Sequence, residues 1–283
     1  MAGVGRRSTR RHGRGRYPFA SLIIVALGRF GYAAEGLVHI LIGALAVQVA
    51  FGYGGETIDY RGVLLRLAEG PFGRVLLLEV VAGFVGYAIW RFLQAALDLE
   101  GKGHDIRGII ARLGFANTGV LHLAFAVSAV RLLGTGDAGA NTDATAKGVT
   151  AQLLGRPFGQ WLVALIGLVF LGMAVFQLCR AITAGFRDDA NLGGVSRIEV
   201  RVYTILGRIG HTARGVVFAT IGFFFLNAAW RIEPEEARGL DTALAALVAH
   251  SFGPGLLGAV AFGFVAYGLF LVAEARFHHL EAN

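Results

Sequence analysis

One sequence motif occurs three times in this chain, and that repetition limits what the chain can fold into. The motif is an arginine, any residue, a glycine, four further residues and a second glycine, and an apolar run follows it each time. The three copies run from Arg29 to Gly36, from Arg112 to Gly119 and from Arg208 to Gly215. A repeat this regular indicates one structural unit used three times, with insertions in its loops.

The second half of the unit is repeated as well. A turn is expected at Pro71–Gly73, at Pro157–Gly159 and at Ser251–Gly253. Each turn precedes about 24 mostly apolar residues, enough for a helix to cross a hydrocarbon core roughly 30 Å thick. The unit is therefore predicted to be a membrane hairpin, and the chain to have six spans. These are expected at 28–51, 74–97, 112–133, 160–182, 208–230 and 255–277.

The composition supports a membrane protein. Of the 283 residues, 55% are hydrophobic and only 16% are charged, whereas a soluble domain has about 25% charged residues. Glycine is abundant, with 42 residues, as expected where small residues let helices pack closely in lipid. The predicted fold class is an all-α membrane protein: three tandem helical hairpins in a pseudo-threefold arrangement, with short amphipathic helices on the outer side.

The expected division of the chain follows the repeats. Residues 1–25 form a basic tail, 26–104 repeat one, 105–190 repeat two and 191–283 repeat three. The tail has six arginines between Arg6 and Arg16. Beside a membrane span, such a cluster favours retention in the cytoplasm over nucleic-acid binding.

Short amphipathic segments precede the three turns. Each has apolar residues on one helical face and is expected to lie at the membrane interface. They are Arg61–Glu69, Lys147–Leu154 and Gly239–Leu247.

Ionisable residues within the spans are the candidate functional residues, because charge is costly in lipid. Counted from the repeated arginine, Glu35, Thr118 and Arg214 are equivalent. One helical turn further, His39, His122 and Phe218 are equivalent. A ligand-binding polar core is expected from Glu35, His39, Thr118, His122 and Arg214. Within it we expect an ion pair between Glu35 and Arg214, with the Thr118 hydroxyl donating to the carboxylate.

Structural roles compete with these functional ones. The repeated arginines Arg29, Arg112 and Arg208 are expected to extend to lipid phosphates, and Gly36, Gly119 and Gly215 to serve helix packing. A buried Glu–Arg pair can be purely architectural, and the histidines can simply hydrogen-bond within the bundle. The one cysteine, Cys179, is expected to be buried, and it excludes a cysteine-based metal site.

The chain has no recognisable catalytic motif, so no enzymatic chemistry, metal or cofactor is expected. We expect a polytopic inner-membrane protein that binds or passes a small solute or a lipid through its polar centre. One alternative is an accessory or scaffold subunit that binds another membrane protein. Another is a haem protein with His39 and His122 as axial ligands. The expected partners are the lipid bilayer and other membrane proteins, without nucleic acid.

The repeated motif, the Phe-Gly turn and the GlyTyrAlaIleTrpArg sequence at Gly86–Arg91 together resemble a family of bacterial integral membrane proteins catalogued as domain of unknown function 1206. The resemblance covers nearly the whole chain beyond residue 25. It implies six spans in three two-helix repeats and no particular activity. The chain departs from the pattern at Ser251, at Gly172–Gln177 and at Ala266–Leu271.

The distribution of basic residues predicts the topology. The chain has 26 lysines and arginines, of which Arg214 lies within a span. Of the others, 17 fall on the side of the two termini and of the loops that follow the second and fourth spans, and eight fall on the other side. Because cytoplasmic loops carry the excess of Lys and Arg, both termini are expected in the cytoplasm. A reporter fused after Asn283 should behave as cytoplasmic and one inserted near Gly139 as exported. Export of the Asn283 fusion would contradict the orientation.

Overall fold

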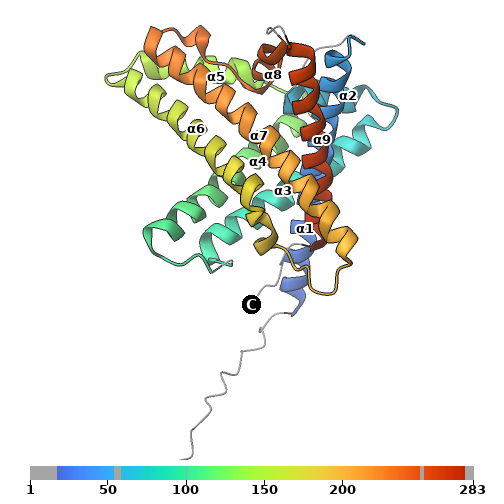
Figure 1. The fold of residues 1–283 in the computed structure, drawn as a ribbon. Coiled ribbons are helices and arrows are strands. Elements are labelled where there is room, and N and C mark those ends of the chain that lie inside the picture. Colours follow the sequence, from blue (N-terminus) through green and yellow to red (C-terminus); the bar gives the residue numbers. More distant parts are fainter. Residues whose placement is uncertain (1–17, 54–58, 100, 249–251, 278–283) are drawn as a thin grey trace, which may run out of the picture.

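The computed structural model describes residues 18–53, 59–99, 101–248 and 252–277, and the regular elements of these residues are helices (Figure 1). Six of the helices are long and apolar enough to cross a membrane. They are α1 (Pro18–Ala50), α3 (Gly73–Leu97), α4 (Ile106–Thr135), α6 (Gly159–Thr183), α7 (Arg197–Arg231) and α9 (Gly253–Phe277). The expected all-α fold with six candidate spans is confirmed. Residues 1–17, which include the six arginines of the basic tail, lie outside the described residues, and residues 18–25 belong to α1.

Three of these helices, α1, α4 and α7, begin well before the expected spans, and polar caps account for the starts of α4 and α7. Helix α7 begins at Arg197 because Ser196 and Glu199 form a capping box, in which each side chain accepts a hydrogen bond from the other residue's backbone. Helix α4 begins at Ile106 because the Asp105 side chain accepts from the Gly108 N–H. Polar caps therefore extend both helices beyond the apolar region.

Three short helices lie at one end of the bundle (Figure 1). They are α2 (Tyr60–Glu69), α5 (Thr142–Leu154) and α8 (Leu240–Val248). The predicted surface segments are thus helical. Two 3₁₀ helices that were not expected, η1 (Gly185–Asp189) and η2 (Pro234–Glu236), lie in the linkers.

The surface helices are joined to one another by polar contacts. The Asp59 carboxylate accepts from the Thr142 N–H at 2.6 Å, and the Thr142 hydroxyl accepts from the Leu240 N–H at 3.1 Å. On α5, Lys147 lies 3.1 Å from Glu235 and 3.2 Å from Asp143. Its hydrogen bonds to these two carboxylates raise the pKa of Lys147. The three helices therefore form one connected layer.

The long helices pack mainly between successive repeats. The closest pairs are α3 with α4, α6 with α7, and α9 with α1, the last of which joins repeat three to repeat one. The second glycine of each motif makes this contact. A Cβ added at Gly36 would lie 2.7 Å from the Gly268 carbonyl oxygen, and one at Gly215 would lie 2.9 Å from Leu178 Cγ. At Gly119 the neighbour is the Phe92 ring, 3.0 Å away. The expected packing role of these three glycines follows from this geometry.

The first glycine of the motif packs within a hairpin, but only in repeats one and three. An added Cβ would lie 2.8 Å from Tyr87 Cα at Gly31 and 2.6 Å from Tyr267 Cα at Gly210, whereas at Gly114 it meets nothing within 4 Å. In line with this, α1 packs on α3 and α7 on α9, but α4 and α6 are not among the packed pairs. The threefold pattern therefore holds between repeats, and the hairpin of repeat two is open.

The sequence explains the open hairpin. In repeats one and three, Gly83 packs directly on Ala34 and Gly263 on Ala213, which lets the two helices approach closely. Repeat two has Val169 at the position equivalent to Gly83, and this side chain is 54% exposed. A β-branched residue in place of glycine prevents the same approach.

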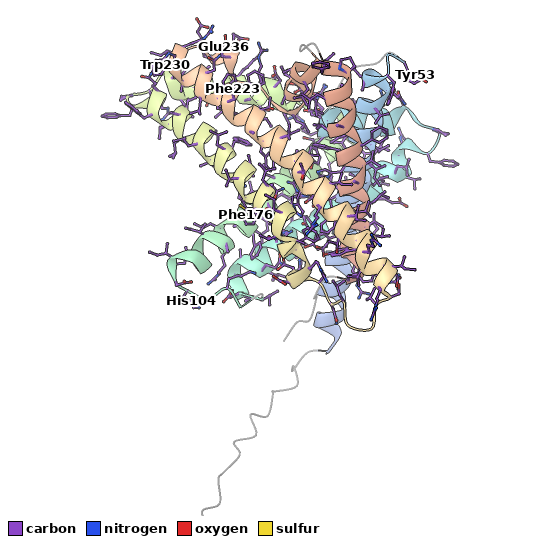
Figure 2. All side chains as sticks on the ribbon, viewed as in Figure 1. Tyr53, His104, Phe176, Phe223, Trp230 and Glu236 are labelled. Carbon is purple, nitrogen blue, oxygen red and sulfur yellow. The ribbon has the colours of Figure 1, made fainter. Side chains whose placement is uncertain are left out.

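The outer surface of the helices is apolar, as lipid contact requires. Phe176, Phe223 and Trp230 project from the bundle (Figure 2) and are 58%, 64% and 85% exposed. Cys179 is also exposed, so the expectation that it is buried was wrong. It lies on α6, which packs on α7 but not on α4.

The glycine contacts predict the effect of three matched substitutions. Gly31→Ala and Gly210→Ala should each lower the free energy of unfolding by about 1–3 kcal/mol, because the added methyl group overlaps tyrosine backbone. Gly114→Ala should leave stability unchanged or raise it by up to about 1 kcal/mol, because alanine favours the helix. Unfolding of the purified variants in bicelles measures this. Equal losses at all three positions would contradict the open hairpin.

Candidate functional site

The ionisable residues predicted from the spans gather near the middle of the bundle. Glu35 and His39 on α1 and His122 on α4 are all buried, with exposed fractions of 5%, 2% and 4%. The Glu35 Oε2 and His122 Nε2 atoms are 3.5 Å apart. Arg214 on α7 contributes a partly buried guanidinium to the same region. We call the region formed by these four residues the polar centre.

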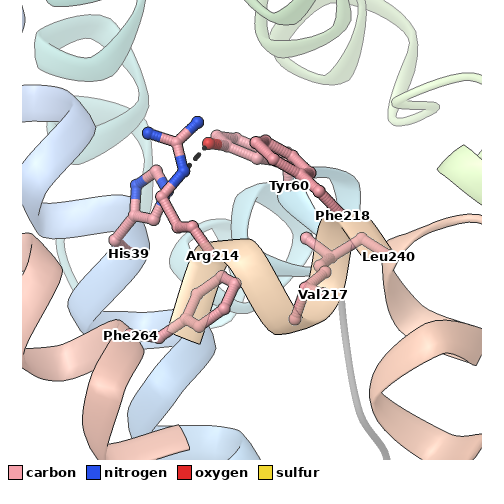
Figure 3. Close-up of a pocket in the computed structure, with 7 residues that line it drawn as sticks. All are labelled: His39, Tyr60, Arg214, Val217, Phe218, Leu240 and Phe264. Atoms are coloured by element: carbon pink, nitrogen blue, oxygen red, sulfur yellow. Dashed lines mark hydrogen bonds between the residues drawn. The ribbon is translucent and has the colours of Figure 1, made fainter. Parts of the chain in front are cut away.

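The two histidines are held in the same way. His39 Nδ1 lies 2.9 Å from the Glu35 carbonyl oxygen, and His122 Nδ1 lies 2.8 Å from the Thr118 carbonyl oxygen. A carbonyl can only accept, so in both rings Nδ1 carries the hydrogen. Each Nε2 is thereby directed toward other side chains. For His39 that partner is the Tyr60 hydroxyl, at 3.3 Å (Figure 3).

Arg214 is held by aromatic side chains. Its guanidinium donates to the Tyr267 hydroxyl and lies over the Tyr267 and Phe218 rings, 4.5 Å and 5.2 Å from their centroids. Such cation–π contacts favour a buried cation. In the described part of the chain, no carboxylate lies within ion-pair distance of Arg214.

A small cavity of about 50 Å³ lies beside Arg214 (Figure 3). A cavity needs roughly 10–15 Å³ to hold one water, so this cavity has room for a few waters. Three of its lining side chains are polar and four are apolar. The lining residues are His39, Tyr60, Arg214, Val217, Phe218, Leu240 and Phe264.

Two of the predicted contacts are not formed. Glu35 pairs with His122, and Arg214 donates to Tyr267, so the direct Glu35–Arg214 ion pair was wrong. The physical reason is that α9 packs on both α1 and α7 and places Tyr267 against the guanidinium. The Thr118 hydroxyl donates to the Gly114 carbonyl oxygen of its own helix, at 2.9 Å, and not to the carboxylate.

Tyrosines are the members of the site that sequence reasoning missed. Tyr87 and Tyr267 occupy equivalent places in repeats one and three, and each accepts a hydrogen bond from an arginine. The partner of Tyr87 is Arg91, which also lies 3.0 Å from the Gln94 side-chain oxygen. A tyrosine repeated at one position of an apolar helix is the signal that could have revealed them, because a buried hydroxyl needs a partner.

The repeated arginines act mainly on the preceding repeat. Arg112 donates to the carbonyl oxygens of Ala95 at 2.7 Å and Ala96 at 3.1 Å, near the C-terminal end of α3. Arg208 donates to the Ile182 carbonyl oxygen near the end of α6, at 3.4 Å. These arginines satisfy helix-end carbonyls that have no partner in the helix. Arg29 is exposed at the start of the apolar part of α1.

A second polar cluster lies between α6, α7 and α9. His211 Nδ1 is 3.3 Å from the Gln177 side-chain oxygen, and Tyr203 donates to Glu274 at 2.9 Å. His211 occupies the place of Tyr32 in repeat one. Its ring is stacked on Phe186, with the centroids 5.2 Å apart. These contacts join α6, α7 and α9, and they are packing interactions.

The polar centre does not fit a metal or haem. Among the described residues, no three His, Cys, Asp or Glu side chains are grouped as metal ligands. The Nε2 atoms of His39 and His122 face Tyr60 and Glu35, and the 50 Å³ cavity beside His39 is far too small for a porphyrin. The site offers a guanidinium, a hydroxyl and an imidazole to a small polar ligand instead.

The six apolar helices, the repeated hairpin and the central polar residues define a polytopic membrane protein. The family model described as Domain of Unknown Function (DUF1206) matches the chain three times, at residues 30–98, 113–184 and 209–278, so the chain belongs to this family. The chain is also 33% identical over 258 residues to Uncharacterized protein YxxB of Bacillus subtilis (strain 168). That alignment covers 91% of this chain and 92% of the relative. No solved structure matches the chain.

The contact between Arg214 and Tyr267 generates a double-mutant prediction. Tyr267→Phe should lower the free energy of unfolding by about 1–3 kcal/mol, because a buried guanidinium loses a hydrogen bond. Combined with Arg214→Gln, the loss should be smaller than the sum of the single losses, since the two groups act on each other. The control Tyr53→Phe, at a residue that is 82% exposed, should change little. Additive losses would contradict the coupling.

Proposed function

We propose that this protein binds a small anionic solute in its polar centre and carries it across the membrane. The observation that supports this is the environment of Arg214: a guanidinium beside a cavity, held by Tyr267 and without a carboxylate at ion-pair distance among the described residues. A cation in the membrane interior is costly unless it is compensated. An anion in the cavity would supply that compensation.

The balance of charge in the centre supports the same solute class. Arg91 and Arg214 bring two guanidiniums, and both interact electrostatically with the one carboxylate of Glu35. With Arg91 counted beside the four residues of the polar centre, two guanidiniums face one carboxylate, so positive charge is in excess even when Glu35 is ionised. His39 and Tyr60 add polar side chains to the cavity wall.

The size of the cavity supports a solute of only a few heavy atoms. About 50 Å³ corresponds to a few waters, which suits chloride, nitrate or formate better than a metabolite. Leu240 at the start of α8 and Phe218 on α7 line the cavity. Movement of the surface helix would then open the cavity toward the end of the bundle where α2, α5 and α8 lie. Transporters built from repeats commonly bind substrate near the bilayer midplane.

The proposal includes the location of the protein. We place it in the bacterial cytoplasmic membrane with both termini in the cytoplasm, on the excess of basic residues on that side. The layer of α2, α5 and α8 then faces outward. The proposed function has no catalytic step, so we propose a transport protein and not an enzyme.

A second candidate function is that of an accessory subunit. The open hairpin of repeat two favours it, because the apolar faces of α4 and α6 do not pack on each other. Another membrane protein could fill that space. In that case, neutralising Arg214 would alter assembly or stability but not the binding of an anion.

The test of the proposed function is anion binding by the full-length protein in lipid nanodiscs. Sodium chloride, nitrate and formate are titrated against sodium gluconate of equal ionic strength, with calorimetry as the measurement. At least one small anion should bind saturably, and Arg214→Gln should weaken it by about tenfold or more, because a charge-assisted contact is lost. Arg208→Gln changes an exposed arginine earlier on the same helix and should leave binding unchanged. The proposal is wrong if none of these anions binds, or if binding survives Arg214→Gln.

A further inference from the structure

One ring nitrogen of His122 can accept a hydrogen bond, but no neighbouring group donates one to it. Its Nδ1 donates to the Thr118 carbonyl oxygen at 2.8 Å, so a neutral ring has a lone pair on Nε2. That Nε2 is buried, has no hydrogen-bond partner among the described residues, and faces Glu35 Oε2 at 3.5 Å. The carboxylate, when ionised, also presents a lone pair. Two acceptors thus face each other with no donor between them.

This arrangement is unfavourable unless a proton is present. A buried polar atom without a partner costs about 1–3 kcal/mol, and the repulsion between two lone pairs is poorly screened inside a membrane bundle. The 3.5 Å separation leaves no room for a water between the two atoms. One added proton turns the repulsion into an ion pair between an imidazolium and a carboxylate.

We propose that Glu35 and His122 together form a proton-binding site inside the membrane bundle. His122 Nε2 takes the proton, and the Glu35 carboxylate compensates its charge. The equivalent histidine of repeat one, His39, is not such a site, because its Nε2 already faces the Tyr60 hydroxyl. His39 and His122 are thus equivalent imidazoles of the same tautomer, but only His122 has an Nε2 atom that accepts no hydrogen bond.

The charged and titratable groups around Glu35 determine the charge balance to which the proton is added. The titratable and charged side chains that interact with it come from α1, α2, α3, α4, α7 and α9. They are His39, Tyr60, Tyr87, Arg91, His122, Arg214 and Tyr267. Glu35 is the one carboxylate in this set, so a proton on His122 adds to an existing excess of positive charge.

A proton and an anion would therefore assist each other in binding. An anion beside Arg214 lowers the cost of a second positive charge on His122, and the protonated ring in turn favours the anion; such coupling is reciprocal. This step rests on the proposed anion function, whereas the proton site itself does not. Transport of the anion would then be coupled to uptake of a proton.

The proton site is tested without any added anion. Full-length protein with nitrogen-15-labelled histidine in nanodiscs is titrated by NMR between about pH 5 and 8, where histidine changes charge. The spectra should contain a His122 ring with hydrogens on both nitrogens, whereas the His39 ring should carry its hydrogen on Nδ1 alone. A His122 ring that stays neutral throughout would overturn the proposal.

Matched variants identify the role of the carboxylate. In Glu35→Gln, His122 should lose its second ring proton at a pH where the parent protein keeps it, because a compensating charge at this distance is removed. Glu79→Gln removes an exposed carboxylate of α3 and should leave the titration unchanged. An unchanged titration in Glu35→Gln would show that the pair does not share a proton. Should Glu35→Gln not fold, Glu35→Asp supplies the comparison.

Coupling is tested by calorimetry of nitrate binding in two buffers that differ in ionisation enthalpy. Above the pH at which His122 titrates, the parent protein should take up about one proton per anion, and His122→Gln should bind without proton uptake. No nitrate binding, together with the expected NMR titration, would reject the anion function and leave the proton site standing. Nitrate binding without proton uptake would reject the coupling.

Discussion

Close contact between helices at the second glycine of each motif is the interaction on which the rest of the structure depends. In lipid no hydrophobic force brings helices together, so association depends on close packing. Gly36 and Gly215 place α1 and α7 directly on α9 and α6, and Gly119 holds α4 against the Phe92 ring of α3. These contacts fix the depth of α1, α4 and α7, the first long helix of each repeat. Equivalent residues of the repeats therefore lie at the same level of the bundle.

Within that symmetric frame, the sequence differs between repeats where the polar centre forms. Glu35, Thr118 and Arg214 share one position and carry a negative, a neutral and a positive side chain. The hairpin of repeat two is open because Val169 replaces the glycine that repeats one and three use for close approach. Helix α6 therefore packs on α7 but not on α4, and the central ionisable residues come from the other long helices.

The fold could be predicted from the sequence because its signals are strong: apolar runs of spanning length, a repeated motif, and amphipathic segments before each turn. The helix starts at Ile106 and Arg197 could not, because they depend on single capping residues outside the apolar runs. In the site, Glu35, His39, His122 and Arg214 were found because ionisable residues are rare in apolar spans. The side chains that these four residues contact were not predicted. Repeat equivalence gives the depth of a side chain but not its direction around the helix. In the structure Arg214 points toward Tyr267, and Glu35 points toward His122.

Arginine suits the centre for a reason that lysine does not share. A planar guanidinium can lie over the Phe218 and Tyr267 rings while one of its N–H groups donates to the Tyr267 hydroxyl. It is weakly hydrated and stays charged in proteins, so the rings and the hydroxyl are sufficient to hold it without a carboxylate. Those contacts come from neutral groups, so a counter-charge at close range is left to the anion that we propose for the cavity. The Glu35 carboxylate is directed at the His122 imidazole, 3.5 Å away, and acts on the guanidinium only through longer-range electrostatics.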